Sequence, residues 1–216
     1  MSLLALQNRE VSPVTVGIFF ALFLAYAPTP ALRAQQPGTA IIFYAQPQLN
    51  DDLWADLLQS LRADLNAGID ESPNGFALQQ EPTYLRGNRD LAVRVDFSKV
   101  IIVKLLGRCD VLPQSDRPSL KGPLGWVLEV SGKIQPFIFV DCTRIGKVIR
   151  TRSAALNKYE RRHEMAQAIA HVVIHEWIHV ATQSPAHGAH GISKQFLSPE
   201  ELTAEPKISL RSASTP

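Results

Sequence analysis

A helical pattern that ends in HEWIH places the tightest constraint on what this chain can fold into. From about residue 153 to residue 182, apolar side chains recur every three or four positions, and Pro185 then stops the helix. His175 and His179 are four residues apart, so a helix places both imidazoles on one face. Two neutral imidazoles in that position can bind one metal ion, and Glu176 lies near enough to reach a water at that ion.

Two alternative interpretations of this helix remain open at the level of sequence. In the first, it is an ordinary amphipathic helix whose histidines are satisfied by backbone groups or by water. In the second, His171 and His175 are the metal pair, since they have the same spacing. No carboxylate directly follows His171, and the residues beyond His179 continue the metal pattern better. We therefore expect His171 to be a supporting or core residue.

A catalytic zinc site takes three protein ligands and leaves one position open. Two histidines, His187 and His190, follow the helix in the segment AHGAHG, whose glycines let the backbone fold back under the helix. Carboxylates of the next helical segment, among them Glu201, are alternative ligands. Such charges are also explained by the favourable dipole at a helix start.

The first 34 residues have the features of a separate targeting segment. The apolar run Val14–Ala27 is shorter than the roughly 20 residues that a membrane span needs, and helix breakers and small residues follow it. This order predicts a signal peptide over residues 1–34, cleaved after Ala34 or, as second choice, after Ala31. The alternative is an uncleaved anchor, because Glu10 lies in a long charged region. Either way we expect the rest of the chain to be secreted or periplasmic.

Export bears directly on the two cysteines of the chain, Cys109 and Cys142. Both lie at the ends of strand-like runs, and neither has the CxxC spacing of a zinc or redox site. In an oxidising compartment such a pair predicts one disulfide. The alternative is a pair of buried free thiols.

The composition is that of an ordinary globular domain. The chain is 45% apolar and 19% charged, with a formal net charge of +2 and no long charged run, so we expect no nucleic-acid partner. We assign residues 35–206 to one domain, which carries the HEWIH helix, and residues 207–216 to a flexible C-terminal tail.

The order of the remaining elements indicates the fold class. An amphipathic helix starts at Asp51 and is closed by Gly68, residues 69–90 are typical of a loop, and a short helix starts after Ser198. Strands are expected over residues 40–47, 91–97 and 98–109 and on both sides of Ser131-Gly132. Together with the HEWIH helix this is an α+β arrangement, a mixed sheet with two main helices of which the second carries HExxH.

A family resemblance adds to this reading. HEWIH followed by a chain reversal, a further histidine and an apolar turn resembles the metzincin branch of the zinc peptidases. It also resembles a looser group of exported bacterial proteins with HExxH, seven residues and a histidine. The resemblance covers about residues 165–202. It implies a zincin-like fold, His187 as the third ligand ahead of His190 with Glu201 third, and Gly191-Ile192-Ser193 as the turn below the metal.

Three features depart from the metzincin pattern HExxHxxGxxH. The segment Thr182-Gln183-Ser184-Pro185 replaces the glycine that ends the helix, and the third histidine lies two residues later. Both differences change the path of the turn between the helix and the third histidine. Pro185 offers another way for the chain to make that turn. Ser193 stands where the family has methionine. This difference leaves the chemistry of the three metal ligands unchanged.

The resemblance implies an exported Zn²⁺-dependent metallopeptidase that cleaves a peptide or protein substrate, with Glu176 as general base. The substrate adds as a strand to an exposed sheet edge, for which residues 123–130 are the candidate; an interior strand is the alternative. No stable membrane association is expected after signal cleavage. A catalytically weak or inactive zincin-fold domain that binds metal or a partner is the alternative function, and a secreted structural domain with fortuitous histidines is a third.

Overall fold

The computed structural model describes residues 38–45, 48–67, 81–87, 99–111 and 122–205. All of them belong to the unit Pro37–Pro216. The signal peptide over residues 1–34, the strand over 91–97 and the tail over 207–216 fall outside the described residues and stay predictions. Among the helices that are described, none combines the length and apolarity that crossing a bilayer requires.

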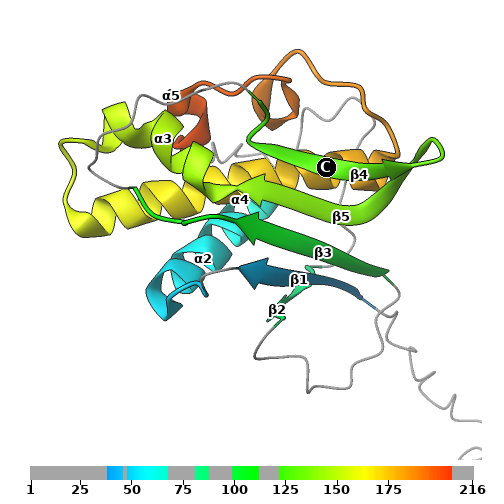
Figure 1. The fold of residues 1–216 in the computed structure, drawn as a ribbon, viewed down its shortest axis with the longest axis horizontal. Helices are drawn as coiled ribbons and strands as arrows, with labels where there is room; N and C mark the ends of the chain where they lie inside the picture. The colour runs from blue at the N-terminus through cyan, green and yellow to red at the C-terminus, as the bar shows by residue number, and fades with distance from the viewer. Residues whose placement is uncertain (1–37, 46–47, 68–80, 88–98, 112–121, 206–216) are drawn as a thin grey trace, which may run out of the picture. The chain divides into compact units, whose positions relative to one another are not determined.

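Within the described ranges, five strands form one mixed sheet in the order β2-β1-β3-β5-β4 (Figure 1). Their bounds are β1 Thr39–Ala45, β2 Thr83–Arg86, β3 Lys99–Leu106, β4 Gly125–Val130 and β5 Lys133–Asp141. The strands β2, β1, β3 and β5 are parallel, and β4 runs antiparallel to β5 at one edge. The α+β class with a mixed sheet is therefore confirmed, and so is the edge position predicted for the strand within residues 123–130.

Two long helices cover one face of this sheet (Figure 1). The helices are α2 Asp51–Ala67, α3 Cys142–Ser153, α4 Lys158–Thr182 and α5 Pro199–Leu202, with a 3₁₀ turn over Gly191–Ser193. α2 and α4 pack against each other and bury the alternate strand residues that face them, such as Ile41, Val103 and Ile138, each fully buried. Burial of this apolar surface is the main force that holds α4 against the sheet.

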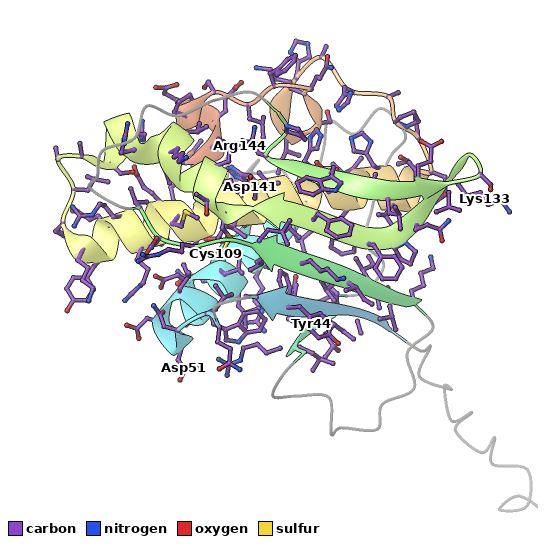
Figure 2. All side chains as sticks on the ribbon, in the orientation of Figure 1. Tyr44, Asp51, Cys109, Lys133, Asp141 and Arg144 are labelled. Carbon is purple, nitrogen blue, oxygen red and sulfur yellow. A yellow bond between two sulfur atoms is a disulfide. The ribbon has the colours of Figure 1, made fainter. Side chains whose placement is uncertain are left out.

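The other face of the sheet carries aromatic side chains that tie the edge strand to its neighbours (Figure 2). Trp126 of β4 stacks on Phe139 of β5, with ring centroids 5.4 Å apart and an interplanar angle of 6°. Lys104 of β3 lies 5.7 Å from the centroid of the same Phe139 ring. Because side chains alternate along a strand, Gly125 and Val127 lie on the side of β4 that faces the helices. This side of β4 borders the site described below.

Local sequence explains how α4 begins, and Pro185 explains why it stops. Asn157 accepts hydrogen bonds from the backbone N–H groups of Tyr159 and Glu160, and the Glu160 carboxylate accepts one from the Asn157 N–H, which makes a complete capping box. At the other end Gln183 adopts a left-handed conformation with φ 52°. The helix therefore ends at Thr182, three residues before Pro185, where the sequence predicts its end.

The structure corrects two of the predicted elements. Residues 69–90, predicted to be a loop, contain β2, whose four residues are too few for a clear alternating pattern. The helix α3 was not predicted as a separate element, because its sequence follows a strand directly and is rich in Arg and Lys. The Asp141 side chain caps α3 by accepting from the Arg144 N–H, and Ile145 and Ile149 bury its apolar face.

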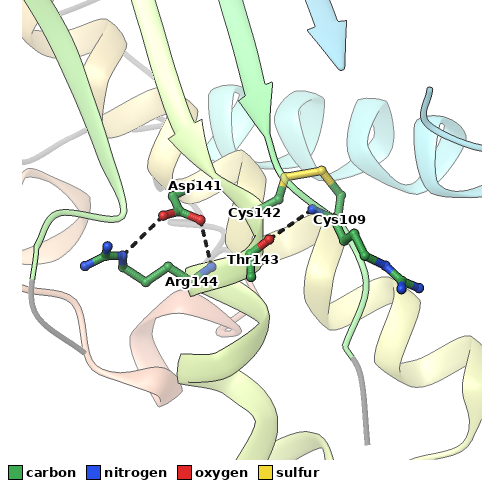
Figure 3. Close-up of a disulfide and its surroundings, with 6 residues drawn as sticks. Cys109, Asp141, Cys142, Thr143 and Arg144 are labelled. Atoms are coloured by element: carbon green, nitrogen blue, oxygen red, sulfur yellow. Dashed lines mark hydrogen bonds and ion pairs between the residues drawn. A yellow bond between two sulfur atoms is a disulfide. The ribbon is translucent and has the colours of Figure 1, made fainter. Parts of the chain in front are cut away.

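The structure joins Cys109 to Cys142 (Figure 3), with the two sulfur atoms 2.11 Å apart. The bond links the segment after β3 to the first residue of α3. Beside it, the Arg108 N–H donates to the Thr143 hydroxyl at 3.0 Å. The predicted cysteine pairing is the one seen, and the free-thiol alternative is not.

Candidate metal centre

Three imidazole rings converge at the C-terminal end of α4. His175 and His179 lie one turn apart on the same face, and their Nε2 atoms are 3.2 Å apart. The ring of His187 lies 5.2 Å from that of His175 and 4.8 Å from that of His179, centroid to centroid. One ring nitrogen from each histidine lies within 4.8 Å of the others. This is the predicted trio, in an arrangement that allows one ion three nitrogen ligands.

Backbone carbonyls determine which nitrogen of each helical histidine carries the proton. The Nδ1 of His175 lies 2.7 Å from the Ile192 carbonyl oxygen, and the Nδ1 of His179 lies 2.7 Å from the Ser184 carbonyl oxygen. A carbonyl oxygen can only accept, so both Nδ1 atoms carry hydrogen and both neutral rings keep a lone pair on Nε2. A metal-binding histidine usually has its second nitrogen held in this way.

The residues present fit a metal ion on these grounds. Two Nε2 lone pairs 3.2 Å apart repel each other unless a cation lies between them. Bonds of about 2.0–2.1 Å to a tetrahedral zinc place neighbouring ligand nitrogens roughly 3.3 Å apart. The separation of the two nitrogens therefore matches one edge of such a tetrahedron, and a ring nitrogen of His187 lies within 4.8 Å of both.

A tight turn brings His187 back to the helix. The Ser184 hydroxyl accepts from the Ala186 N–H at 3.2 Å, which reverses the chain after the helix end. The Gly188 N–H then donates to the Ser193 carbonyl at 2.9 Å, so the segment after His187 pairs with the 3₁₀ turn. That turn is the one that presents the Ile192 carbonyl to His175. One short segment thus supplies both the third ring and an orienting acceptor.

The other histidines and acidic residues considered from sequence lie elsewhere. His190 is exposed, and its carbonyl accepts from the Ser193 hydroxyl at 3.0 Å. Glu201 is held by Lys194, at 2.5 Å, and by the Ser198 N–H in a capping box of α5. Neither belongs to the group of convergent ligand atoms among the described residues.

His171 lies on α4 but takes part in a different cluster. Its Nε2 is 3.0 Å from the Gln167 amide nitrogen and 3.3 Å from an Asp64 carboxylate oxygen of α2. All three side chains are buried. This agrees with the expectation that His171 is a core or supporting residue, and it removes His171 from the metal pair.

Glu176 lies beside the three histidines and directly against the edge strand. It is buried, with 6% of its surface exposed. A Cβ atom added at Gly125 of β4 would meet Val172 Cγ1 at 2.5 Å and Glu176 Oε1 at 3.0 Å. The absence of a side chain at Gly125 is what lets the backbone of β4 approach the carboxylate so closely.

A pocket of about 640 Å³ opens at this point, and its wall includes the three histidines and Glu176. Much of the rest of the wall is apolar, contributed by Leu124, Trp126, Val127, Val148, Val172 and Leu197. A concave apolar site with a few convergent polar groups is the usual form of a ligand-binding or active site.

Burial sets the protonation of the groups in this pocket. It lowers the pKa of His175 to about 4. The neighbouring His179 and His187 also lower this pKa, and the hydrogen bond that His175 donates to the Ile192 carbonyl opposes the shift. Burial also lowers the pKa of His187. Burial raises the pKa of Glu176 to about 7. Both histidine shifts favour the neutral ring, the state in which imidazole binds metal, at His175 and at His187.

Sequence reasoning missed several groups that shape the site. The carbonyls of Ser184 and Ile192 leave no signal in a sequence, because every residue has a carbonyl. Gly125 leaves a weak one, since an isolated glycine in a strand often marks close backbone approach. Gln183, which caps α4, has no sequence signature. Comparisons with protein-family models, curated proteins and solved structures returned no match for this chain.

Proposed function

We propose that this chain is an exported, zinc-dependent metallopeptidase of the metzincin-like type, with a zincin-like fold. One observation carries the proposal. His175, His179 and His187 converge with Glu176 on the wall of one apolar pocket, and the edge strand β4 borders that pocket. A metal ligand set, a carboxylate and a free strand edge are the three parts that peptide hydrolysis of this kind requires.

The donor set favours zinc as the cofactor. Three neutral imidazoles are a common ligand set of catalytic zinc, and they leave the fourth position open to water. His175 and His179 have their Nδ1 atoms occupied by carbonyls, so each offers Nε2 to the ion. When bound, zinc lowers the pKa of its water toward about 7 and polarises the scissile carbonyl.

Glu176 has the position of a general base. Its carboxylate accepts a proton from the attacking water as the bond from water oxygen to carbonyl carbon forms, and passes that proton to the amine nitrogen as the carbon–nitrogen bond breaks. A pKa near 7 suits both transfers at neutral pH. Burial against β4 shields the carboxylate from bulk water.

The substrate of this proposal is an extended peptide. β4 has β5 on one side, and within the described sheet its other side has no strand partner. Backbone groups on that side can pair with a peptide laid along the strand, whose side chains then alternate into and away from the apolar pocket. In this proposal, pairing with β4 places the substrate peptide across the three histidines.

The variant Glu176→Gln tests the proposal, because it removes the base and keeps the shape. We expect the variant to bind one zinc ion like the wild type, by metal analysis after dialysis, and to lose cleavage of a quenched-fluorescence peptide library. Glu200→Gln, an exposed carboxylate at the start of α5, is the matched control and should cleave normally.

Two results of this experiment would change the assignment. A wild-type chain that binds zinc but cleaves nothing in the library would favour the alternative function, a zincin-fold domain that binds metal or a partner without turnover. A wild-type chain that binds no zinc would remove the metal centre altogether and leave a structural domain.

A further inference from the structure

The side chain of Gln183, just after α4, is hydrogen-bonded to the backbone of β5. Gln183 donates from its amide nitrogen to the Ile134 carbonyl at 2.9 Å, and its amide oxygen accepts from the Ile134 N–H at 3.2 Å. The same amide nitrogen lies 2.8 Å from the Val180 carbonyl, one of the carbonyls left without a helical partner at the end of α4. A single amide thus satisfies both backbone groups of one residue in β5, as a neighbouring strand would.

The backbone conformation of Gln183 is one that a residue other than glycine rarely adopts without support from its contacts. Gln183 has φ 52° and ψ 34°, a left-handed conformation that glycine adopts readily and that most other residues avoid. Glutamine occupies this position although glycine would adopt the conformation at a lower cost. A residue held in an unfavourable conformation needs contacts elsewhere to hold it, and the amide bridge to Ile134 supplies them.

The next residue connects this bridge to the histidines. The Ser184 carbonyl accepts from His179 Nδ1 at 2.7 Å, and the Ser184 hydroxyl begins the turn that leads to His187. A shift of Gln183 would therefore displace the Ser184 carbonyl that orients the His179 ring. It would also displace the turn that carries His187. Thr182, one residue earlier, only donates back to Ile178 within the helix.

We propose that Gln183 is a positioning residue of the metal centre: its amide bridge to Ile134 holds the Ser184 carbonyl against His179 and sets the start of the turn to His187. The inference rests on the proposed metal centre for its effect on affinity, but the orientation of the His179 ring is a property of the protein alone. Gln183 itself touches no ligand atom.

The variant Gln183→Asn isolates the reach of the amide, since asparagine keeps the amide and tolerates the left-handed conformation but is one carbon shorter. Gln183→Gly is the second variant, which relaxes the backbone and removes the amide. Thr182→Val is the matched control. Far-UV circular dichroism establishes that each variant is folded.

Two measurements on the full chain follow. Cobalt titration with the d–d absorption spectrum reports metal binding; both Gln183 variants should bind Co²⁺ about 10–100-fold more weakly, the usual effect of losing a group that orients a ligand. Long-range ¹H–¹⁵N spectra of the metal-free chain report the His179 tautomer; the Nδ1–H form should dominate in the wild type and in Thr182→Val, and be mixed in both Gln183 variants.

The outcomes separate the two ideas. Wild-type cobalt affinity together with an undisturbed Nδ1–H tautomer in both Gln183 variants would overturn the positioning role. If the wild type binds no cobalt, the proposed function fails, and the tautomer spectra alone then decide whether Gln183 orients His179.

Discussion

Gly125 and Glu176 stand so close that a methyl group added at Gly125 would crowd the carboxylate and clash with the neighbouring Val172. A Cβ atom at residue 125 would lie 3.0 Å from Glu176 Oε1 and 2.5 Å from Val172 Cγ1. The backbone at Gly125 does not have a positive φ, so these close contacts, and not backbone strain, oppose a larger residue there. This contact couples the position of the edge strand to that of the proposed base.

Gly125→Ala should therefore affect both stability and catalysis. Overpacking of this kind costs about 1–3 kcal/mol of unfolding free energy, and the displaced carboxylate should lower kcat for peptide cleavage. Urea denaturation and steady-state kinetics measure the two effects. Gly132→Asn in the hairpin turn is the control, because nothing lies within 4 Å of its added Cβ and asparagine tolerates the positive φ. If Gly125→Ala and Gly132→Asn have the same unfolding free energy and the same kcat, the neighbours of Gly125 can move aside at little cost.

A second prediction compares the two histidines of AHGAHG. His187→Ala removes a ring that faces His175 and His179, so zinc affinity should fall by more than the about 10–100-fold expected for an orienting group. His190→Ala is the matched control, since His190 is exposed and outside the group of convergent atoms. Competition with a chromophoric chelator measures both affinities. A larger loss for His190→Ala would place the third ligand at residue 190.

The histidine pattern could be read from the sequence because its geometry is local. HEWIH on a helix fixes two rings and a carboxylate through the helical period alone, and the turn residues after Pro185 bring His187 back within eight residues of His179. The α+β class, the hairpin at Ser131-Gly132 and the capped start of α5 were predictable on the same basis.

What could not be predicted depends on contacts between distant residues. Gln183 meets Ile134 across 49 positions, and nothing near either residue marks the partner. Gly125 faces Glu176 only because β4 lies at the sheet edge beside α4. Likewise β2 is a strand through its pairing with β1, since its own four residues carry little pattern. Long-range packing overrides local propensity in each case.

A third prediction concerns the buried cluster between α2 and α4. Asp64→Ala would leave Gln167 and His171 without their carboxylate partner in the core, at a cost of about 1–3 kcal/mol. Zinc binding should be unchanged, because the cluster contributes no atom to the convergent group. Glu81→Ala breaks an exposed ion pair with Arg62 and should cost about 0–1 kcal/mol. Urea denaturation checks both. Loss of zinc in Asp64→Ala would show that the cluster supports the metal centre.

A fourth prediction concerns the disulfide. Replacing both Cys109 and Cys142 by Ala opens a loop with a sequence separation of 33 residues, which should lower the unfolding free energy by about 3–4 kcal/mol on the chain-entropy model. Urea denaturation with and without reductant measures it. The double variant itself is the control for the reductant, because it should not respond. If the urea midpoint of the wild type is the same with and without reductant, the disulfide contributes little to the unfolding free energy.

The Cys109–Cys142 bond also decides what a single cut does to the molecule. The edge strand β4 and its partner β5 both lie between the two cysteines in the chain. A peptidase that severs any one bond between residues 109 and 142 therefore leaves two fragments that remain one covalent molecule. Such a nicked form would migrate as an intact chain on a gel until reduced, and it would keep the strand proposed to receive substrate attached to the helix proposed to act on it.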